Sequence, residues 1–310
     1  MSKIAFLFAG QGSQAVGMGK DLYENIPAVA KLFDEAEKYR KGTLKQMFEG
    51  EDEELKKTKN TQPCLFLADL AAAKALEENG IKADAAAGFS LGEIVGVGYS
   101  GALSIASAFE LVCERGLFMQ KAADEHKGSM IAVMKYDKEK LIKASEEAGV
   151  YPVNFNCPGQ IVVSGDSEKI DSLKEVLSSD GARIIPLPVG GPFHSPFMKE
   201  ASEGLAKCLS DNERFPLKKT DIPLYANKNA LPYTDDIELM KETLSGQISN
   251  PVLWEDTLIN MSKDNIDTFI ECGPGKTLSG FVKRTLPEAK IFNVSDMDSL
   301  NKTLEELKRN

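Results

Sequence analysis

The chain has 310 residues, of which 42% are hydrophobic and 27% charged, and its formal net charge at pH 7 is −10. At roughly 150 residues per domain, this length suggests about two globular domains. The negative charge argues against a general binder of nucleic acid or anionic membranes, which needs a surplus of Lys and Arg.

The cysteines and the first residues exclude further classes. The five cysteines are widely spaced and form no CxxC pair, so neither a disulfide framework nor a zinc site is indicated. The opening "MSKIAFLFA" contains an apolar run of only six residues without a cleavage pattern, so we expect no signal peptide. No stretch reads as a transmembrane helix. We therefore expect a cytoplasmic protein.

The first third of the chain alternates strand and helix patterns. "KIAFLFAGQGSQ" predicts a strand buried on both faces that runs into a Gly-rich loop. Helical patterns follow at about 21–39 and 64–78. The run "ADAAA" at 83–87 is weak as a strand because alanine has low strand propensity. The residues after it are helical in pattern, so strand, turn and helix are predicted around residue 90.

A different pattern begins near residue 128. In chain order it predicts a strand, a helix, two strands, a helix and a strand, at 129–136, 137–149, 150–156, 160–165, 166–181 and 182–189. This βαββαβ order is ferredoxin-like and is complete within about 70 residues. We predict an inserted domain at 127–197, inside a larger α/β domain formed by residues 1–126 and 198–310. The larger domain resumes with strands at 222–228 and 266–275 and a helix at 276–286.

One serine stands in a motif that carries chemistry. "Gly88-Phe89-Ser90-Leu91-Gly92" matches G-x-S-x-G, whose glycines allow the sharp strand-to-helix turn that exposes a nucleophilic serine. The motif is short, and a turn serine or a helix N-cap is the alternative. A nucleophilic serine needs a base, usually histidine.

Two histidines are available as that base. His126 lies in the polar segment "ADEHKG" and is expected on the surface. His194, in "GGPFHSP", lies in a loop stiffened by Gly and Pro where the small domain returns to the large one. His194 is the better candidate, although a structural role is open.

Arg115 is predicted to be buried. It falls within the apolar arc of the helical segment "SIASAFELVCERGLFMQKA". Its neighbours three and four positions away are apolar: Leu111, Val112, Phe118 and Met119. A buried guanidinium needs a partner, so either a distant carboxylate or the carboxylate of a ligand is expected to bind it.

The loop "Gly10-Gln11-Gly12-Ser13-Gln14" allows two interpretations. With Ala15 it matches the dinucleotide pattern G-x-G-x-x-A, and Asp34 lies at about the right distance, but it falls in a helical pattern rather than at a strand end. Alternatively, the loop brings backbone N–H groups close to a reacting centre and holds an oxyanion.

Taken together, the motifs resemble one enzyme family. "GQGSQ", "GFSLGE", "RG" 25 residues after Ser90 and "GPFHSP" 104 residues after it are similar to those of the malonyl-CoA:acyl carrier protein transacylases. Four further similar stretches follow in the family's order: "TQPCLF" at 61–66, "NFNCPGQIVVSG" at 154–165, "QISNPVLW" at 247–254 and "ECGPGKTL" at 271–278.

The resemblance implies a hydrolase-like parallel-sheet core with a ferredoxin-like insertion. It implies that Ser90 attacks the thioester and that His194 is its base. It further implies that the N–H groups of Gln11 and Leu91 bind the oxyanion and that Arg115 binds the malonyl carboxylate. The backbone carbonyl of Gln247 is expected to hold the histidine, and Gln62 and Phe193 are expected to support the site. The reaction implied is ping-pong transfer of malonyl from malonyl-CoA, through a malonyl-serine, to the phosphopantetheine thiol of acyl carrier protein, for fatty-acid elongation.

Two phenylalanines stand directly before the proposed nucleophile and base, and only the second bears on substrate choice. The family usually has His before the serine, whereas this chain has Phe89, which changes packing or hydrogen bonding there. Phe193 resembles the malonyl-selective form of the motif in related acyltransferases, so malonyl is favoured over methylmalonyl. No permanent cofactor and no metal are expected.

The expected partner, acyl carrier protein, is itself acidic. A local basic patch would have to override the net charge of this chain, and Lys276, Lys283 and Arg284 are the candidates, with a solvated helix face as the alternative. No nucleic acid or membrane partner is expected, and the chain is expected to be a monomer.

Two other functions compete with the transferase. A serine hydrolase would share the motif and the base but would need an acid such as Asp166 or Asp171, which read better as helix caps. A carrier-protein or acyl-CoA binding module would leave the coincidence of Ser90, His194 and the Gly-rich loop unexplained.

Overall fold

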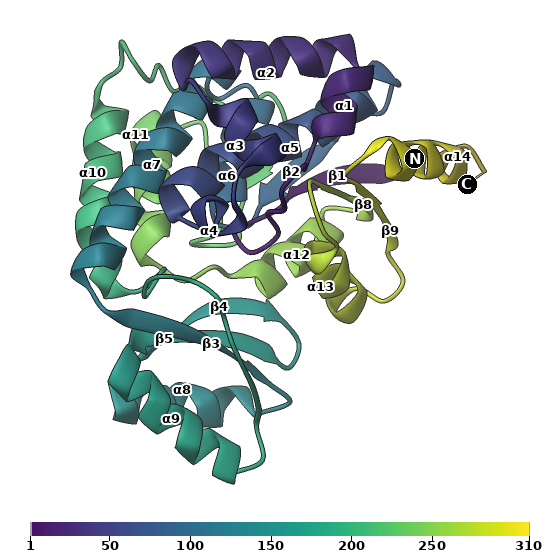
Figure 1. The fold of residues 1–310 in the computed structure, drawn as a ribbon. Helices are drawn as coiled ribbons and strands as arrows, with labels where there is room; N and C mark the ends of the chain where they lie inside the picture. The colour runs from purple at the N-terminus through teal and green to yellow at the C-terminus, as the bar shows by residue number, and fades with distance from the viewer. Residues whose placement is uncertain (1, 310) are drawn as a thin grey trace.

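The computed structural model describes residues 2–309 and contains two sheets, visible in Figure 1 as the upper body and the smaller lower part. The larger sheet has the strand order β7-β2-β1-β8-β9, and all its pairings are parallel. The smaller has the order β4-β5-β3-β6 and is antiparallel. The predicted class, an α/β core with an inserted ferredoxin-like domain, is confirmed.

The elements before the small sheet are β1 (Lys3–Phe8), α1 (Lys20–Asn25), α2 (Pro27–Tyr39), α3 (Thr43–Glu49), α4 (Asp52–Leu55), α5 (Thr58–Glu78), β2 (Ala85–Gly88), α6 (Leu91–Tyr99) and α7 (Ile105–Glu125). The small sheet and its helices are β3 (Gly128–Met134), α8 (Lys138–Ala148), β4 (Tyr151–Cys157), β5 (Gln160–Asp166), α9 (Ser167–Ser179) and β6 (Arg183–Pro186).

The chain then returns to the large sheet. These elements are η1 (Pro196–Met198), α10 (Lys199–Ser210), β7 (Leu224–Tyr225), α11 (Ile237–Gly246), η2 (Gln247–Ser249), α12 (Trp254–Lys263), β8 (Ile266–Cys272), α13 (Thr277–Thr285), β9 (Lys290–Val294) and α14 (Met297–Arg309). All elements of the small sheet lie inside 127–197. We therefore keep 127–197 as the proposed bounds of the inserted domain.

The first strand is buried on both faces, as its continuous apolar run predicts. Phe6 and Phe8 pack into one core with residues of α5, α6 and α7, whereas Ala5 and Leu7 pack into a second core with residues of α12 and α13. Because β1 lies in the middle of the sheet, the loop that follows it is held at the carboxyl edge, beside the end of β2.

The alanine-rich run does form a strand. β2 pairs with β1 on one side and with β7 on the other, and its alanines are buried in both cores. Tertiary pairing therefore overrides the low strand propensity of alanine. The strand ends at Gly88, three residues before α6 begins at Leu91.

One face of the small sheet packs against the larger α/β domain; below, the larger domain and the inserted domain are called the large and the small unit. On β3, Met130 and Ala132 join the main core, while Ile131 and Val133 pack with residues of α8 and α9 in a core of their own. Figure 1 shows α8 and α9 on the outer face of the small sheet. The two units therefore meet across the inner face of this sheet.

Some predicted boundaries were wrong. The helix predicted at 21–39 is two helices, because Pro27 opens α2 and disfavours helical backbone at Ile26, which is extended. The helix predicted at 64–78 begins earlier, at Thr58. The last strand of the small domain, predicted at 182–189, spans only Arg183–Pro186.

Candidate active site

Ser90 lies on the sharp turn between β2 and α6. Its φ of 55° and ψ of −106° are costly for a residue with a side chain. The flanking glycines make the turn possible: a Cβ on Gly88 would lie 1.9 Å from the carbonyl of Gly92, and one on Gly92 would lie 2.4 Å from the carbonyl oxygen of Phe8. The motif therefore folds as the elbow that its spacing predicts.

Asn227 holds this elbow from the other side and was missed by the sequence reasoning. Its Oδ1 accepts a hydrogen bond of 2.7 Å from the Ser90 N–H, and its Nδ2 donates one of 2.6 Å to the Gly88 carbonyl. The side chain is fully buried just beyond β7. It bridges the two ends of the strained turn, so it stabilises a conformation that the glycines only permit.

His194 contacts the serine directly. Its Nε2 lies 2.8 Å from Ser90 Oγ, and its Nδ1 lies 3.0 Å from the carbonyl oxygen of Gln247 and 3.2 Å from that of Asn250. Since carbonyls only accept, Nδ1 carries the proton and Nε2 is the free acceptor for the serine hydroxyl. Burial and the charge of Arg115 lower the pKa of His194 to about 4, against those backbone contacts. The ring is therefore neutral at pH 7, as a base must be.

Arg115 is fully buried beside the same serine. Its Nη2 donates to Ser90 Oγ at 3.1 Å and to Gln247 Oε1 at 2.6 Å. Its Nε and Nη1 are buried and have no hydrogen-bond partner among the described residues. Burial lowers the pKa of Arg115 to about 10, and the charge of Glu93 opposes that shift. The guanidinium therefore stays charged at pH 7 and keeps donors free.

The structure answers where the partner of Arg115 is. In the part of the chain that the structure describes, Arg115 forms no ion pair; Glu93 acts on it through its charge, with the Gln247 side chain hydrogen-bonded to both. The predicted distant carboxylate therefore exists as Glu93, but it is linked to Arg115 through the Gln247 amide and does not contact it directly. The unpartnered Nε and Nη1 leave donors for the carboxylate of a ligand, which stays a prediction.

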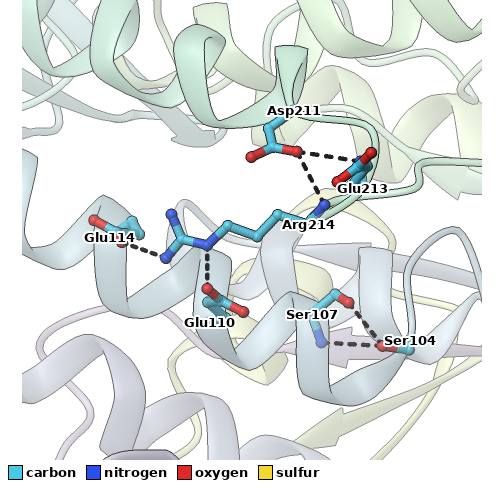
Figure 2. Close-up of polar contacts among 7 residues, drawn as sticks. All are labelled: Ser104, Ser107, Glu110, Glu114, Asp211, Glu213 and Arg214. Carbon is cyan, nitrogen blue, oxygen red and sulfur yellow. Dashed lines mark hydrogen bonds and ion pairs between the residues drawn. The ribbon is translucent and has the colours of Figure 1, made fainter.

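The helix that carries Arg115 is fixed on two sides. Gly116 allows α7 to pack closely on α5, since a Cβ there would lie 3.2 Å from the Lys59 Cα. Figure 2 shows Arg214, from the loop after α10, reaching Glu110 and Glu114 on α7; its Nη2 lies 2.6 Å from Glu114. These contacts hold the register of α7, and with it the guanidinium.

The Gly-rich loop after β1 lies against the elbow. A Cβ on Gly10 would be 2.8 Å from the Phe89 carbonyl oxygen, and Gln11 donates from its Nε2 to Thr58 Oγ1 at 3.3 Å. Leu91 is the first residue of α6, so its N–H has no acceptor inside the helix. The oxyanion roles of Gln11 and Leu91 stay predictions, supported by the proximity of the loop to the elbow.

The two supporting residues are also buried. Gln62, on α5, donates from Nε2 to the sulfur of Met119 at 3.3 Å, and its Oε1 has no partner among the described residues. Phe193 is 5% exposed and packs in the main core directly before His194. Gln62 therefore links α5 to α7 one turn from Arg115, and Phe193 anchors the histidine loop.

A cavity of about 260 Å³ opens between the two units beside the elbow. Gln11 and Phe89 line it from the large unit, and Asn154 and Gln160 from the small one. The Phe89 ring packs edge-on against Trp254 at 5.4 Å. Phe89 therefore forms apolar wall and contributes packing, which explains how the elbow tolerates it in place of histidine.

Several alternatives lose support from these positions. The dinucleotide interpretation requires an acid at the end of a strand, but Asp34 lies within α2 and accepts from the Tyr23 hydroxyl. That interpretation is therefore wrong. Asp166 caps α9 through the N–H groups of Glu168 and Lys169, as expected for a cap. His126 ends α7 and lies against the Phe197 ring.

The candidate carrier-binding residues are exposed on or next to α13. Arg284 donates from Nη1 to Gln160 Oε1 at 2.7 Å, at the edge of the cavity. Lys276 precedes α13, and Lys283 is in its last turn. Their carrier-binding role stays a prediction.

Among residues 2–309, no helix has both the length and the apolar character needed to cross a membrane. The same residues hold no group of three or more His, Cys, Asp and Glu side chains placed to bind a metal ion.

Comparison with known proteins agrees with this geometry. Residues 5–309 match the family described as acyl transferase domain. A malonyl CoA-acyl carrier protein transacylase of Bacillus subtilis (strain 168) is 42% identical, with 99% of this chain and 98% of that protein covered. The crystal structure of such a transacylase from Clostridium perfringens has a TM-score of 0.93 at 36% identity, covering 99% and 98% of the two chains.

A further solved structure contains a partner. It is a malonyl-transacylase in complex with a type II PKS acyl-carrier protein, 33% identical to this chain, with a TM-score of 0.92 and 98% and 100% of the two chains covered.

Proposed function

Because the chain belongs to the acyl transferase domain family, and within it to the malonyl-CoA:acyl carrier protein transacylases, we propose that it transfers malonyl in two steps through an ester on Ser90. The observation that carries this proposal is the meeting of two groups at one oxygen: His194 Nε2 and Arg115 Nη2 both lie within hydrogen-bond distance of Ser90 Oγ.

In the first step, Ser90 Oγ attacks the thioester carbonyl of malonyl-CoA while its proton passes to His194 Nε2. The negative charge that develops on the carbonyl oxygen is held by the N–H groups of Gln11 and Leu91, each contributing about 3 kcal/mol by comparison with other acyl-transfer sites. The C–S bond breaks, CoA leaves as a thiol with the proton from His194, and malonyl remains on Ser90 as an ester.

In the second step, the phosphopantetheine thiol of the carrier protein enters and loses its proton to His194. The thiolate attacks the ester, the C–O bond breaks, and the proton returns to Ser90. The carrier leaves with malonyl as a thioester. The cavity beside the elbow, lined by residues of both units, supports entry of such an arm from the junction of the two units.

Selection of malonyl rests on Arg115. A carboxylate whose carbon lies two bonds from the reacting carbonyl carbon suits a guanidinium that contacts the nucleophile and retains unpaired donors. The aromatic Phe193 next to the base supports malonyl over branched acyl groups. We further propose that Lys276, Lys283 and Arg284 contact the acidic carrier, that the chain acts as a monomer in the cytoplasm, and that it serves fatty-acid elongation.

A serine hydrolase is the competing function. The bonding of His194 Nδ1 to two backbone carbonyls, in place of a carboxylate, favours the transferase. The test is the fate of the acyl-enzyme: after loading with malonyl-CoA and removal of CoA, holo carrier protein should discharge it far faster than buffer alone. Discharge by water at the same rate with or without carrier would overturn the proposal in favour of a hydrolase.

A further inference from the structure

Glu93 is a buried carboxylate for which the steps above have no use. It lies on α6 three residues after Ser90 and is fully buried. Its Oε1 accepts from the Tyr233 hydroxyl, and its Oε2 accepts from Gln247 Nε2 at 2.9 Å. Burial raises the pKa of Glu93 to about 7 although these hydrogen bonds lower it. Burying a carboxylate costs free energy unless its hydrogen bonds compensate for the loss of water. The groups that hydrogen-bond to Glu93 therefore indicate its role.

The Gln247 side chain is oriented by what surrounds it. A glutamine amide has a donor end and an acceptor end. Its Nε2 faces two acceptors, the Ser90 carbonyl and Glu93, each at 2.9 Å. Its Oε1 therefore faces Arg115, where it accepts from Nη2 at 2.6 Å. Of the two acceptors of Nε2, Glu93 is the charged one and accepts the stronger type of hydrogen bond.

An amide between Glu93 and Arg115 has a consequence for substrate choice. A carboxylate in direct contact would neutralise the guanidinium and compete with the carboxylate of a ligand. An amide oxygen satisfies one nitrogen of Arg115 without neutralising it, so Nε and Nη1 keep their charge and their free donors. The position of the guanidinium is then set by the amide, and the amide by Glu93.

We infer that Glu93, held by Tyr233, is a positioning residue that fixes the Gln247 amide so that Arg115 is aimed at the carboxylate of a dicarboxylic acyl group. This inference rests on the proposed function, since it concerns how the same site selects malonyl. Glu93 touches neither the acyl group nor the reacting atoms, so its loss should alter selection of the acyl group more than acyl transfer itself.

The test compares malonyl with acetyl transfer to holo carrier protein at pH 8, where Glu93 is ionised. Glu93→Ala should lower kcat/KM for malonyl-CoA by about 10- to 100-fold, mainly through KM, as expected for a lost hydrogen bond to a charged group. Acetyl transfer should fall less than about threefold. Glu93→Gln keeps an acceptor for Gln247 and should restore the malonyl-to-acetyl ratio to within about threefold of the wild type. An equal loss for both acyl groups, or no rescue by Gln, would overturn the inference.

Two further variants keep the test decisive if Glu93→Ala does not fold. Tyr233→Phe removes only the hydroxyl that holds Glu93 and should lower the malonyl-to-acetyl ratio by about threefold or more; an unchanged ratio would overturn the inference. Asp69→Ala is the matched control, because Asp69 is equally buried but has no hydrogen bond to Gln247 or Arg115, and it should leave the ratio unchanged. If the wild-type chain itself fails to transfer malonyl, the proposed function fails; if only the ratios fail to respond, the inference alone does.

Discussion

Replacing Asn227 by Ala tests how the strained elbow is held. The change leaves the Ser90 N–H and the Gly88 carbonyl without their hydrogen-bond partner. Each unsatisfied buried group costs about 1–3 kcal/mol, or about 4 kcal/mol for the two. Relaxation of the Ser90 backbone, where φ is 55°, returns part of this, since such strain stores about 1–3 kcal/mol. We therefore expect a net loss of about 2 kcal/mol in the free energy of unfolding.

The assay is urea unfolding followed by tryptophan fluorescence. Trp254 is the single tryptophan of the chain and packs in the core beneath the elbow, against Phe89. Asn229→Ala is the control, because Asn229 is exposed two residues away and its Oδ1 accepts only an exposed hydrogen bond, from the Leu231 N–H; it should change stability by no more than about 1 kcal/mol. Acylation of Ser90 should slow by about 100-fold in Asn227→Ala, since a displaced nucleophile loses its alignment. A variant as stable and as active as the wild type would refute the role of Asn227.

The remaining predictions concern the acyl group, the base and the elbow neighbour. Arg115→Ala should lower kcat/KM for malonyl-CoA by about 100-fold or more and for acetyl-CoA by less than about tenfold; equal losses in steady-state transfer would contradict the assignment. With a pKa of about 4, His194 is about 90% neutral at pH 5, against about 3% for an unshifted ring. The rate of Ser90 acylation by acetyl-CoA, measured by rapid quench, should therefore persist at pH 5. A tenfold fall in that rate by pH 5.5 would contradict the lowered pKa. Phe89→His should keep transfer within about tenfold of the wild type, because the ring packs on Trp254 and the base is His194; complete loss of transfer would show that Phe89 does more than pack.

Local sequence determined what could be predicted of the site. The elbow follows from Gly88 and Gly92, whose missing Cβ atoms are a local requirement of the turn. The burial of Arg115 follows from the helical period, which places it in an apolar arc. Both features depend on residues within a few positions of each other, so a local sequence pattern is enough to predict them.

The groups that support these residues could not be predicted in the same way. Asn227 lies 137 residues from Ser90, in "YANKNA", where asparagine reads as a turn residue. Glu93 is visible in "GFSLGE", but its contact with Gln247 spans 154 residues. Such contacts depend on how β7 and η2 are placed beside β2 and α6, and a single sequence holds no periodic signal for that placement.

The central claim is that Ser90 carries malonyl between two thiols. Its most direct test is the intact mass of the chain after brief incubation with malonyl-CoA, followed by peptide mapping. We predict a mass increase of one malonyl group located on Ser90, absent in Ser90→Ala and removed by holo carrier protein with formation of malonyl-carrier. Malonyl transfer at the full rate in Ser90→Ala, or a stable adduct at another residue, would contradict it.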